Sequence, residues 1–194
     1  MIIWLNGAFG AGKTQTAYEL SRRLPNSYVY DPENAGFFIR DNLPPSLRGD
    51  DFQDYPMWRA FNFAMLDDIA SRFDGHVIVP MTITNRQYYD ELPGALSRRY
   101  DVRHFILYAQ KETLLRRLAS RLESRHSWGA QQIDRCIRAF NEDITEEKVH
   151  TDHWSVGQTA GQIAALAGLA LPEDRRSAFH KSMDRITTKL RHIR

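Results

Sequence analysis

The chain has 194 residues, a length typical of one domain, and its 26 basic and 24 acidic residues leave a net charge of +2. This near balance provides no overall attraction to polyanions, so we expect no nucleic-acid partner. The single cysteine, Cys136, excludes an intrachain disulfide and favours a cytoplasmic location. No apolar run reaches the roughly 18 residues of a membrane span. The apolar run Ile2–Leu5 leads straight into a glycine-rich loop, so we expect no signal peptide.

Short apolar runs alternate with stretches of helical periodicity along the chain. The expected strands are Ile2–Asn6, Ser27–Tyr30, His76–Thr82, Val102–Tyr108 and Lys148–Thr151. The expected helices are Thr14–Leu24, pieces of Asn34–Phe73, part of Tyr88–Tyr100, Glu112–Ser124, Ser127–Ile144 and Val156–Leu169. This order predicts an α/β fold of three layers, in which helices cover both faces of a parallel sheet within one domain over residues 1–171.

The glycine-rich loop from Gly7 to Thr14 has the sequence GAFGAGKT and matches the pattern G-x-x-x-x-G-K-[ST] without a mismatch. An expected strand precedes it and an expected helix follows, which is the context in which such a loop binds phosphate. Backbone N–H groups surround phosphate oxygens, Lys13 places its charge beside the β- and γ-phosphates, and the Thr14 hydroxyl ligates Mg²⁺. The sequence therefore predicts a site for ATP. The expected contacts come from Gly7, Phe9, Gly10, Ala11, Gly12, Lys13, Thr14 and Gln15.

Other features narrow the class of P-loop protein. The Asn-Lys-x-Asp string by which GTPases recognise guanine is absent. The third and fourth expected strands run into Pro80 and Ala109, where ATP hydrolases of the motor and transporter type place an acidic residue. A kinase for a small molecule is the remaining class. Such an enzyme needs a carboxylate for the acceptor hydroxyl, an acceptor pocket, and cations around the transferred phosphoryl group.

Asp31 is the candidate carboxylate because it follows the second expected strand, at the edge where open α/β sheets bind ligands. It can accept the proton of an attacking hydroxyl or hold a Mg²⁺-bound water, and Glu33 can share either role. The alternative for Asp31 is a simple Asp-Pro turn.

Arg117 and Arg121 are the candidate catalytic cations, on a helical face that continues to Arg125. They flank a loop, and residues 117–130 are therefore the expected lid over the triphosphate. The alternative for these arginines is a solvated basic face of the helix.

Aromatic residues gather directly after Asp31, which suits an acceptor with a large apolar or ring-bearing part. The residues expected to contact the acceptor are Asp31, Glu33, Phe37, Phe38, Trp58 and Thr82. For each aromatic residue singly, the alternative is ordinary helical core. His150, Asp152 and His153 lack the further ligands of a metal site, so we expect them in a loop near the nucleotide base.

Residues 172–194 form a separate basic amphipathic segment. An apolar stripe recurs at helical spacing and consists of Phe179, Met183, Ile186, Leu190 and Ile193. Seven Lys and Arg residues against three acidic ones give this segment a net charge of +4. Two interpretations are open: a helix packed on its own domain with a solvated basic face, or a helix lying on an anionic membrane surface.

Four blocks of the chain resemble the tunicamycin-resistance proteins, which are ATP-binding members of the nucleoside-monophosphate-kinase-like P-loop fold. The blocks are IIWLNGAFGAGKT, YVYDPENAGFFIR, VIVPMTIT and VHTDHWSVGQTAGQIAAL, and the likeness covers most of the chain. The broader kin, chloramphenicol phosphotransferase and shikimate kinase, also carry an aspartate at the position of Asp31. The resemblance implies a core of about five parallel strands, of the nucleotide and shikimate kinase type.

The same resemblance implies ATP and Mg²⁺ as cofactors, and resistance to the nucleoside antibiotic tunicamycin through its ATP-dependent phosphorylation. The alternative is an ATP-binding protein that sequesters tunicamycin without phosphoryl transfer. The C-terminal segment resembles an amphipathic tail expected in this family, which implies peripheral contact with the inner face of the membrane.

Overall fold

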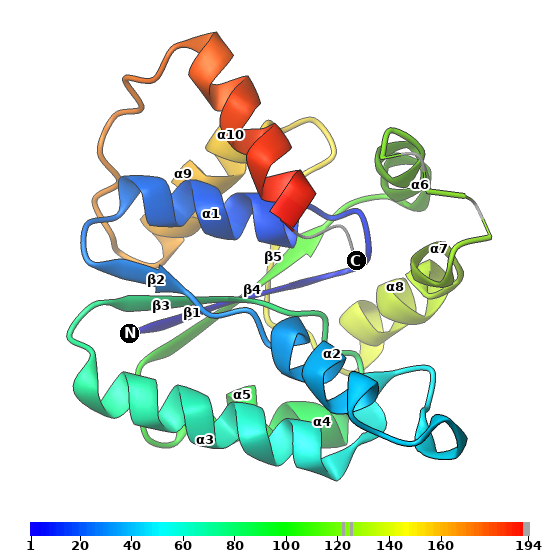
Figure 1. Cartoon of the computed structure of the whole chain (residues 1–194). Helices are drawn as coiled ribbons and strands as arrows, with labels where there is room; N and C mark the ends of the chain where they lie inside the picture. Colours follow the sequence, from blue (N-terminus) through cyan, green and yellow to red (C-terminus); the bar gives the residue numbers. More distant parts are fainter. Residues whose placement is uncertain (122, 125, 192–194) are drawn as a thin grey trace.

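The computed structural model of the chain describes residues 1–121, 123, 124 and 126–191, with only the backbone described for residues 189–191 (Figure 1). Arg125 and Ile193, which the sequence places on helical faces, lie outside these residues, as does the side chain of Leu190. Within the described part of the chain, no helix combines the length and the hydropathy that crossing a bilayer requires.

Five parallel strands form one sheet in the order β2-β3-β1-β4-β5, which confirms the predicted parallel sheet. The strands are β1 (Ile2–Gly7), β2 (Ser27–Val29), β3 (His76–Pro80), β4 (Val102–Tyr108) and β5 (Glu147–His150). The central strand β1 is buried along its whole length, and Ile3, Trp4 and Leu5 are fully inaccessible. Strands covered on both faces are expected to be continuously apolar, which explains why the run Ile2–Leu5 does not alternate.

Helices cover both faces of this sheet, as the three-layer prediction requires (Figure 1). The α-helices are α1 (Lys13–Arg23), α2 (Glu33–Asp41), α3 (Pro56–Arg72), α4 (Arg86–Glu91), α5 (Pro93–Ser97), α6 (Lys111–Ala119), α7 (Trp128–Gln131), α8 (Ile133–Glu142), α9 (Val156–Leu166) and α10 (Ala178–Arg191). Helices α1, α9 and α10 lie over one face, and α3, α4 and α5 lie over the other. Two short 3₁₀ turns, Pro45–Leu47 and Phe52–Asp54, connect α2 to α3.

The predicted helix Glu112–Ser124 ends earlier than expected. The N–H of Arg121 bonds to the carbonyl of Leu118 at 2.8 Å, and the Ser120 hydroxyl donates to the carbonyl of Arg117 at 2.7 Å. These bonds tighten the last turn, so α6 stops at Ala119. Arg121 therefore follows the helix, and the expectation that it shares a helical face with Arg117 is wrong.

Helix α10 packs on α1 through its polar face, whereas a packed amphipathic helix usually buries its apolar face. Polar residues of the segment contact α1, whereas the apolar side chains Phe179, Met183 and Ile186 are exposed. The segment is therefore attached to its own domain by hydrogen bonds and ion pairs, and the described side chains of its apolar stripe, Phe179, Met183 and Ile186, are directed to solvent.

Candidate functional site

The loop between β1 and α1 has a backbone that requires glycine. Gly7 and Gly10 have φ values of 143° and 84°, in the region that L side chains rarely adopt. A Cβ on Gly7 would lie 2.6 Å from the carbonyl oxygen of Leu107, and one on Gly10 would lie 2.9 Å from that of Leu114. The loop therefore packs tightly against β4 and α6, and its shape is fixed by the neighbouring backbone.

Lys13, the first residue of α1, is buried beneath this loop. Its Nζ donates to the carbonyl oxygens of Gly7 at 2.9 Å and Ala8 at 3.2 Å, and it lies 5.5 Å from the centroid of the Phe9 ring. Burial lowers the pKa of Lys13 to about 8, although the nearby carboxylates of Glu33 and Asp31 partly oppose this shift. The lysine is thus held in the loop as a cation that a bound anion would stabilise.

Two buried side chains connect the loop to the end of β3. The carboxamide of Asn6 accepts from the N–H groups of Gly7 (2.8 Å) and Ile83 (2.9 Å), and it donates to the carbonyl of Ile83 (2.9 Å). The Thr82 hydroxyl donates to the carbonyl of Gly7 at 2.8 Å. The structure thus places Thr82 under the phosphate loop rather than in contact with an acceptor. The sequence gives no signal for this role of Asn6, because its partner Ile83 lies 77 positions away and no local pattern marks such a contact.

The guanidinium of Arg117 forms hydrogen bonds with neighbouring groups of the protein, mainly backbone carbonyls. It donates to the hydroxyl of Thr151 at 3.1 Å and to the Thr151 carbonyl, and a longer contact of 3.5 Å reaches the carbonyl of Ala11. Burial lowers the pKa of this guanidinium, and the carboxylate of Asp152 opposes the shift. Arg117 therefore connects the phosphate loop to the segment between β5 and α9, and a contact with phosphate remains a prediction.

A cavity of about 330 Å³ opens between the phosphate loop and that segment. Its lining includes Gly10, Ala11, Gly12, Gln15, Arg117, Arg121 and Trp154. The first six are candidate site residues from the sequence, whereas Trp154 and the remaining lining residues, Thr16, Ser120, Thr151, Val156, Thr159 and Arg185, are not. The cavity brings the two candidate arginines to the N-terminal end of α1, where the helix dipole and free N–H groups favour an anion.

The expected lid over residues 117–130 touches the loop through an aromatic pair. The Trp128 ring lies 5.1 Å from the Phe9 ring in an edge-on arrangement, and a Cβ on Gly129 would lie 3.1 Å from the Phe9 ring. The Ser127 hydroxyl accepts from the N–H of Ala130 and caps α7. Phe9 thus packs against the lid helix while the backbone of the loop faces the cavity.

Asp31 ends the strand region of β2 and is largely buried. One carboxylate oxygen accepts from the N–H of Glu33 at 3.0 Å, so Asp31 does form the turn that was its alternative role. Asp31 and Glu33 also lie close enough to Lys13 to raise its pKa. Asp31 therefore combines two features: the turn fixes its carboxylate, and the charge of that carboxylate acts on Lys13.

The aromatic residues near Asp31 separate into core and surface. Trp58 is fully buried, and its indole N–H donates to the carbonyl of Pro32 at 3.0 Å, so it supports the turn from behind. The expectation that Trp58 contacts an acceptor is therefore wrong, because its ring fills the core. Phe37 packs on Phe52 at 5.9 Å between ring centroids. Phe38 is 70% exposed and lines a cavity of about 660 Å³ together with Asp31.

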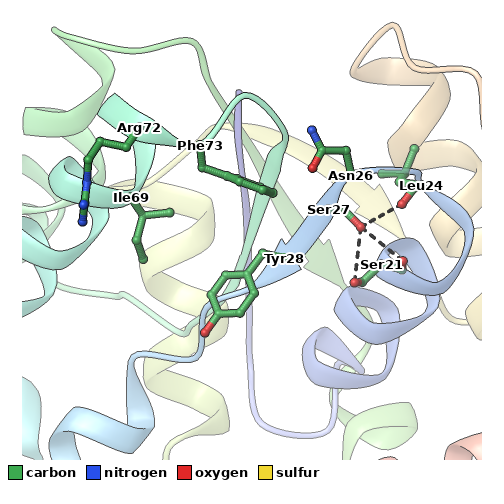
Figure 2. Close-up of a pocket in the computed structure, with 8 residues that line it drawn as sticks. All are labelled: Ser21, Leu24, Asn26, Ser27, Tyr28, Ile69, Arg72 and Phe73. Carbon is green, nitrogen blue, oxygen red and sulfur yellow. Dashed lines mark hydrogen bonds between the residues drawn. The ribbon is translucent and has the colours of Figure 1, made fainter.

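A second cavity of about 560 Å³ continues from the Asp31 cavity, since both are lined by Ser21, Ser27 and Tyr28 (Figure 2). Figure 2 shows Tyr28 between two walls, with Ile69, Arg72 and Phe73 on one side and Ser21, Leu24 and Ser27 on the other. We call the two cavities together the β2-edge groove. Large exposed apolar side chains, namely Tyr28, Phe38, Phe61 and Met65, line the part of the groove nearest Asp31.

Of the three residues expected in a loop after the last strand, Asp152 and His153 follow β5, whereas His150 is the last residue of β5 itself. A carboxylate oxygen of Asp152 accepts from the N–H of Gln110 at 2.9 Å, beside the start of α6. Among the residues that the structure describes, no cluster of three or more histidine, cysteine or acidic side chains is arranged to hold a metal. His150 and His153 line a separate cavity with Asp152, next to Trp154.

Comparisons with known proteins agree with this geometry. Residues 2–142 match the family model described as an AAA domain. The structure of the tunicamycin resistance protein of Deinococcus radiodurans is 33% identical in sequence, with a TM-score of 0.75, and the match covers 89% of this chain and 98% of that one. A comparison with functionally curated proteins finds none that matches.

Two kinases share the fold at lower identity. Shikimate kinase from Bacteroides thetaiotaomicron is 19% identical with a TM-score of 0.60, over 87% of this chain and 99% of that one. The APS kinase of Mycobacterium tuberculosis, solved with AMPPNP and APS, is 16% identical with a TM-score of 0.56, over 86% of this chain and 96% of that one.

The parallel sheet, the glycine loop and these likenesses define a P-loop protein with the fold of the small-molecule kinases. Within that class, the chain belongs to the AAA-domain family and to the family of the tunicamycin resistance proteins.

Proposed function

We propose that this protein is an ATP-dependent phosphotransferase that acts on a hydroxyl group of a small molecule. The observation that carries the proposal is the position of Asp31, a largely buried carboxylate that follows β2 at the carboxyl edge of the sheet and lines a cavity of about 660 Å³. The charges of Asp31 and Glu33 also act on the buried Lys13. A site that only hydrolysed or stored ATP has no need of a carboxylate in a cavity of about 660 Å³ with exposed apolar walls. The name of the Deinococcus relative supports a tunicamycin-like nucleoside antibiotic as the acceptor, which makes antibiotic resistance the biological role.

The loop residues fit a triphosphate with Mg²⁺. Backbone N–H groups of Gly10–Lys13 would bind phosphate oxygens, and the ammonium of Lys13 would offset their charge. Thr14 and Gln15 follow at the start of α1, and the hydroxyl of Thr14 would hold the metal. Mg²⁺ supplies charge neutralisation across the phosphates when it is bound.

The chemical step is an in-line displacement. The acceptor oxygen forms a bond to the γ-phosphorus, and the bond between that phosphorus and the β,γ-bridging oxygen breaks, so ADP leaves with the electron pair. Asp31 takes the hydroxyl proton and returns it to water after product release. Arg121 and Lys13 offset the charge on the transferred group, and Arg117 holds the loop that positions it.

A second candidate function is sequestration of the antibiotic with ATP as a structural ligand. The exposed apolar lining of the β2-edge groove favours it, because such a surface binds a ligand without any group transfer. The two functions differ in stoichiometry. A binder protects against no more drug molecules than there are protein molecules, whereas a phosphotransferase modifies many.

The test is mass spectrometry of tunicamycin after incubation with the protein, Mg²⁺ and ATP, with Lys13→Ala as the control. A gain of one phosphoryl group with the wild type alone is the expected result. Unchanged tunicamycin that co-elutes with the protein only when ATP is present would replace the first function with the second. Unchanged and unbound tunicamycin would contradict both.

We also propose that α10 attaches the protein peripherally to the inner face of an anionic membrane. Phe179, Met183 and Ile186 are exposed side by side at helical spacing, and the segment has a net charge of +4. The test is co-sedimentation of the protein with vesicles of phosphatidylglycerol and phosphatidylcholine. Replacing the three exposed side chains with serine should abolish binding without altering stability, since none of them is buried. Equal binding of the two forms would contradict the proposal.

A further inference from the structure

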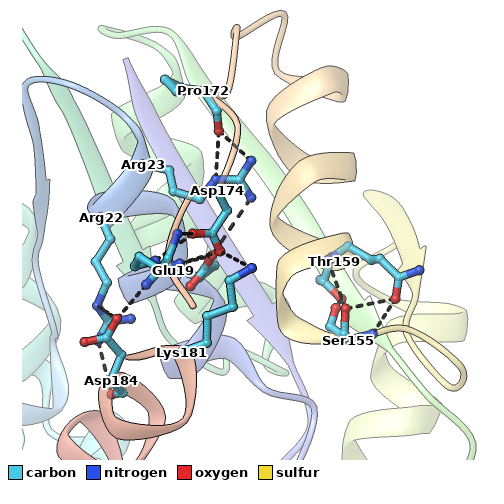
Figure 3. A network of polar contacts seen from close by, with 11 residues as sticks. Glu19, Arg22, Arg23, Ser155, Thr159, Pro172, Asp174, Lys181 and Asp184 are labelled. Carbon is cyan, nitrogen blue, oxygen red and sulfur yellow. Dashed lines mark hydrogen bonds and ion pairs between the residues drawn. The ribbon is translucent and has the colours of Figure 1, made fainter. Parts of the chain in front are cut away.

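The C-terminal segment is attached to α1 by a dense set of polar contacts (Figure 3). Arg176 donates to Glu19 at 2.6 Å, to Asp174 at 2.8 Å and to Asp184 at 2.7 Å. Figure 3 shows Glu19 of α1 surrounded by Asp174, Lys181 and Asp184 of the segment. The Arg176 guanidinium holds the pKa of the Asp174 carboxyl well below its usual range. This network fixes the beginning of α10 against the middle of α1.

Further along, α10 is bonded to both ends of α1: Arg22 lies in its last turn, and Gln15 lies in its first turn, next to the phosphate loop. The side chain of Arg22 donates to the hydroxyl of Thr188 at 2.6 Å and to the carbonyl of Asp184 at 3.3 Å. The carboxamide of Gln15, two residues after Lys13, donates to the carbonyl of Arg185 at 3.1 Å. The backbone of α10 is thus bonded to a residue in the first turn of the helix that follows the phosphate loop.

Arg185 is among the residues that line the same cavity of about 330 Å³ as Gly10–Gly12. Arg117 on α6 and Arg121 in the turn that follows α6 also line it, so three arginines from two segments far apart in the sequence line this cavity. None of the described residues that line it is acidic. Three cations beside a helix N-terminus repel one another unless an anion lies between them, and a triphosphate is such an anion.

We propose that α10 forms a wall of the nucleotide site and that Arg185 contacts the phosphates of the bound nucleotide. The inference rests on the proposed function, because it takes the ligand of this cavity to be ATP with Mg²⁺. It adds a residue from outside the phosphate loop and its lid, 171 positions beyond Thr14 in the sequence. Because the nucleotide then contacts both α1 and α10, nucleotide binding and docking of the segment stabilise each other.

The first experiment measures the affinity for ATP with Mg²⁺ by isothermal titration calorimetry on the full chain. The variants are Arg185→Ala and Arg185→Lys. The matched control is Arg175→Ala, an exposed arginine of the same segment that does not line this cavity. We expect Arg185→Ala to raise the dissociation constant about five- to tenfold, as for loss of one charge-assisted contact. Arg185→Lys should recover part of the affinity, and Arg175→Ala should match the wild type.

The salt dependence of ATP affinity gives a second readout of the Arg185 contact. The loss caused by Arg185→Ala should shrink as the salt concentration rises, because a screened charge contributes less. An Arg185→Ala dissociation constant within twofold of the wild type would overturn the inference while leaving the nucleotide site in place. Absence of ATP binding by the wild type would instead overturn the proposed function itself, and the two failures are thereby distinguished.

The second experiment tests the linkage by amide hydrogen exchange across α10, with and without ATP and Mg²⁺. We expect nucleotide to slow exchange in α10 of the wild type, and to slow it less in Arg185→Ala at saturating nucleotide. Exchange in α10 that does not respond to nucleotide in a wild-type protein that binds ATP would show that the segment is not part of the site.

Discussion

The surroundings of the phosphate loop, which we call the nucleotide side, and the groove beside Asp31, which we propose as the acceptor side, are built in different ways. On the nucleotide side, Lys13, Asn6 and Thr82 are buried, and hydrogen bonds to neighbouring backbone groups hold them. On the acceptor side, the groove beside Asp31 is lined by side chains such as Phe38 and Phe61, which are 70% and 48% exposed. One side is thus fixed before any ligand binds, whereas the other presents apolar surface that a ligand can cover.

This difference assigns different tasks to the two sides. A preorganised phosphate site is not reordered when the transferred group develops charge, which is where fixed dipoles and cations contribute most. An apolar groove binds through the area it buries and accepts ligands of varied shape. Asp31 lies at the junction, since it lines the groove and also lies near Lys13. Substitutions on the nucleotide side and substitutions on the acceptor side should therefore change different measured quantities.

The largest expected effect is that of Asp31→Asn on phosphoryl transfer. Asparagine keeps the shape and can still accept the Glu33 N–H bond, but it cannot take a proton. We expect the rate of transfer to fall by about 10²- to 10⁴-fold, in keeping with loss of a general base. The affinity for ATP should stay within about twofold. The measurements are single-turnover ADP release and calorimetry on the same sample, and an unchanged rate would remove Asp31 from the mechanism.

The next effect concerns stability on the nucleotide side. Asn6→Ala removes three buried hydrogen bonds and leaves the N–H groups of Gly7 and Ile83 without their partner. We expect the free energy of unfolding to fall by about 2–4 kcal/mol. Asn34→Ala, on an exposed position of α2, is the control and should change it by less than about 0.5 kcal/mol. Equal denaturation midpoints in urea for the two variants would mean that Asn6 does not hold the loop.

The nucleotide side was also the more predictable from sequence. The eight loop residues form a local motif, so their backbone geometry follows from glycine positions that can be read directly. The five strands could be predicted because strands buried on both faces of a sheet consist of apolar runs, which can be recognised in the sequence. Asn6 and Arg185 act through contacts across 77 and 170 positions, and no local pattern marks such partners. Trp58 was misassigned because an aromatic residue in a helix gives no indication of which face is buried.

A pH effect on nucleotide affinity follows from the burial of Lys13. Its pKa is lowered to about 8 in the ligand-free protein, and a bound triphosphate favours the charged form and so raises that pKa. ATP affinity should be constant below pH 8 and fall by up to about tenfold per pH unit above it. Calorimetry at pH 8 in two buffers of different ionisation enthalpy should detect proton uptake on binding. Lys13→Ala should show neither the uptake nor the slope, and a wild-type affinity that rises with pH would contradict the assignment.

The smallest expected effect lies on the acceptor side. Phe38→Ser removes an exposed ring from the groove, so we expect tunicamycin to bind about three- to tenfold more weakly, while the free energy of unfolding changes by less than about 0.5 kcal/mol. ATP affinity should not change, because Phe38 does not line the nucleotide cavity. Phe179→Ser is the matched control, since this ring is 71% exposed but lies on α10. If both serine variants weaken drug binding equally, the apolar surface of the molecule binds the drug without a specific groove, and the division between the two sides would not hold. If only Phe38→Ser does so, the groove beside Asp31 is the acceptor site.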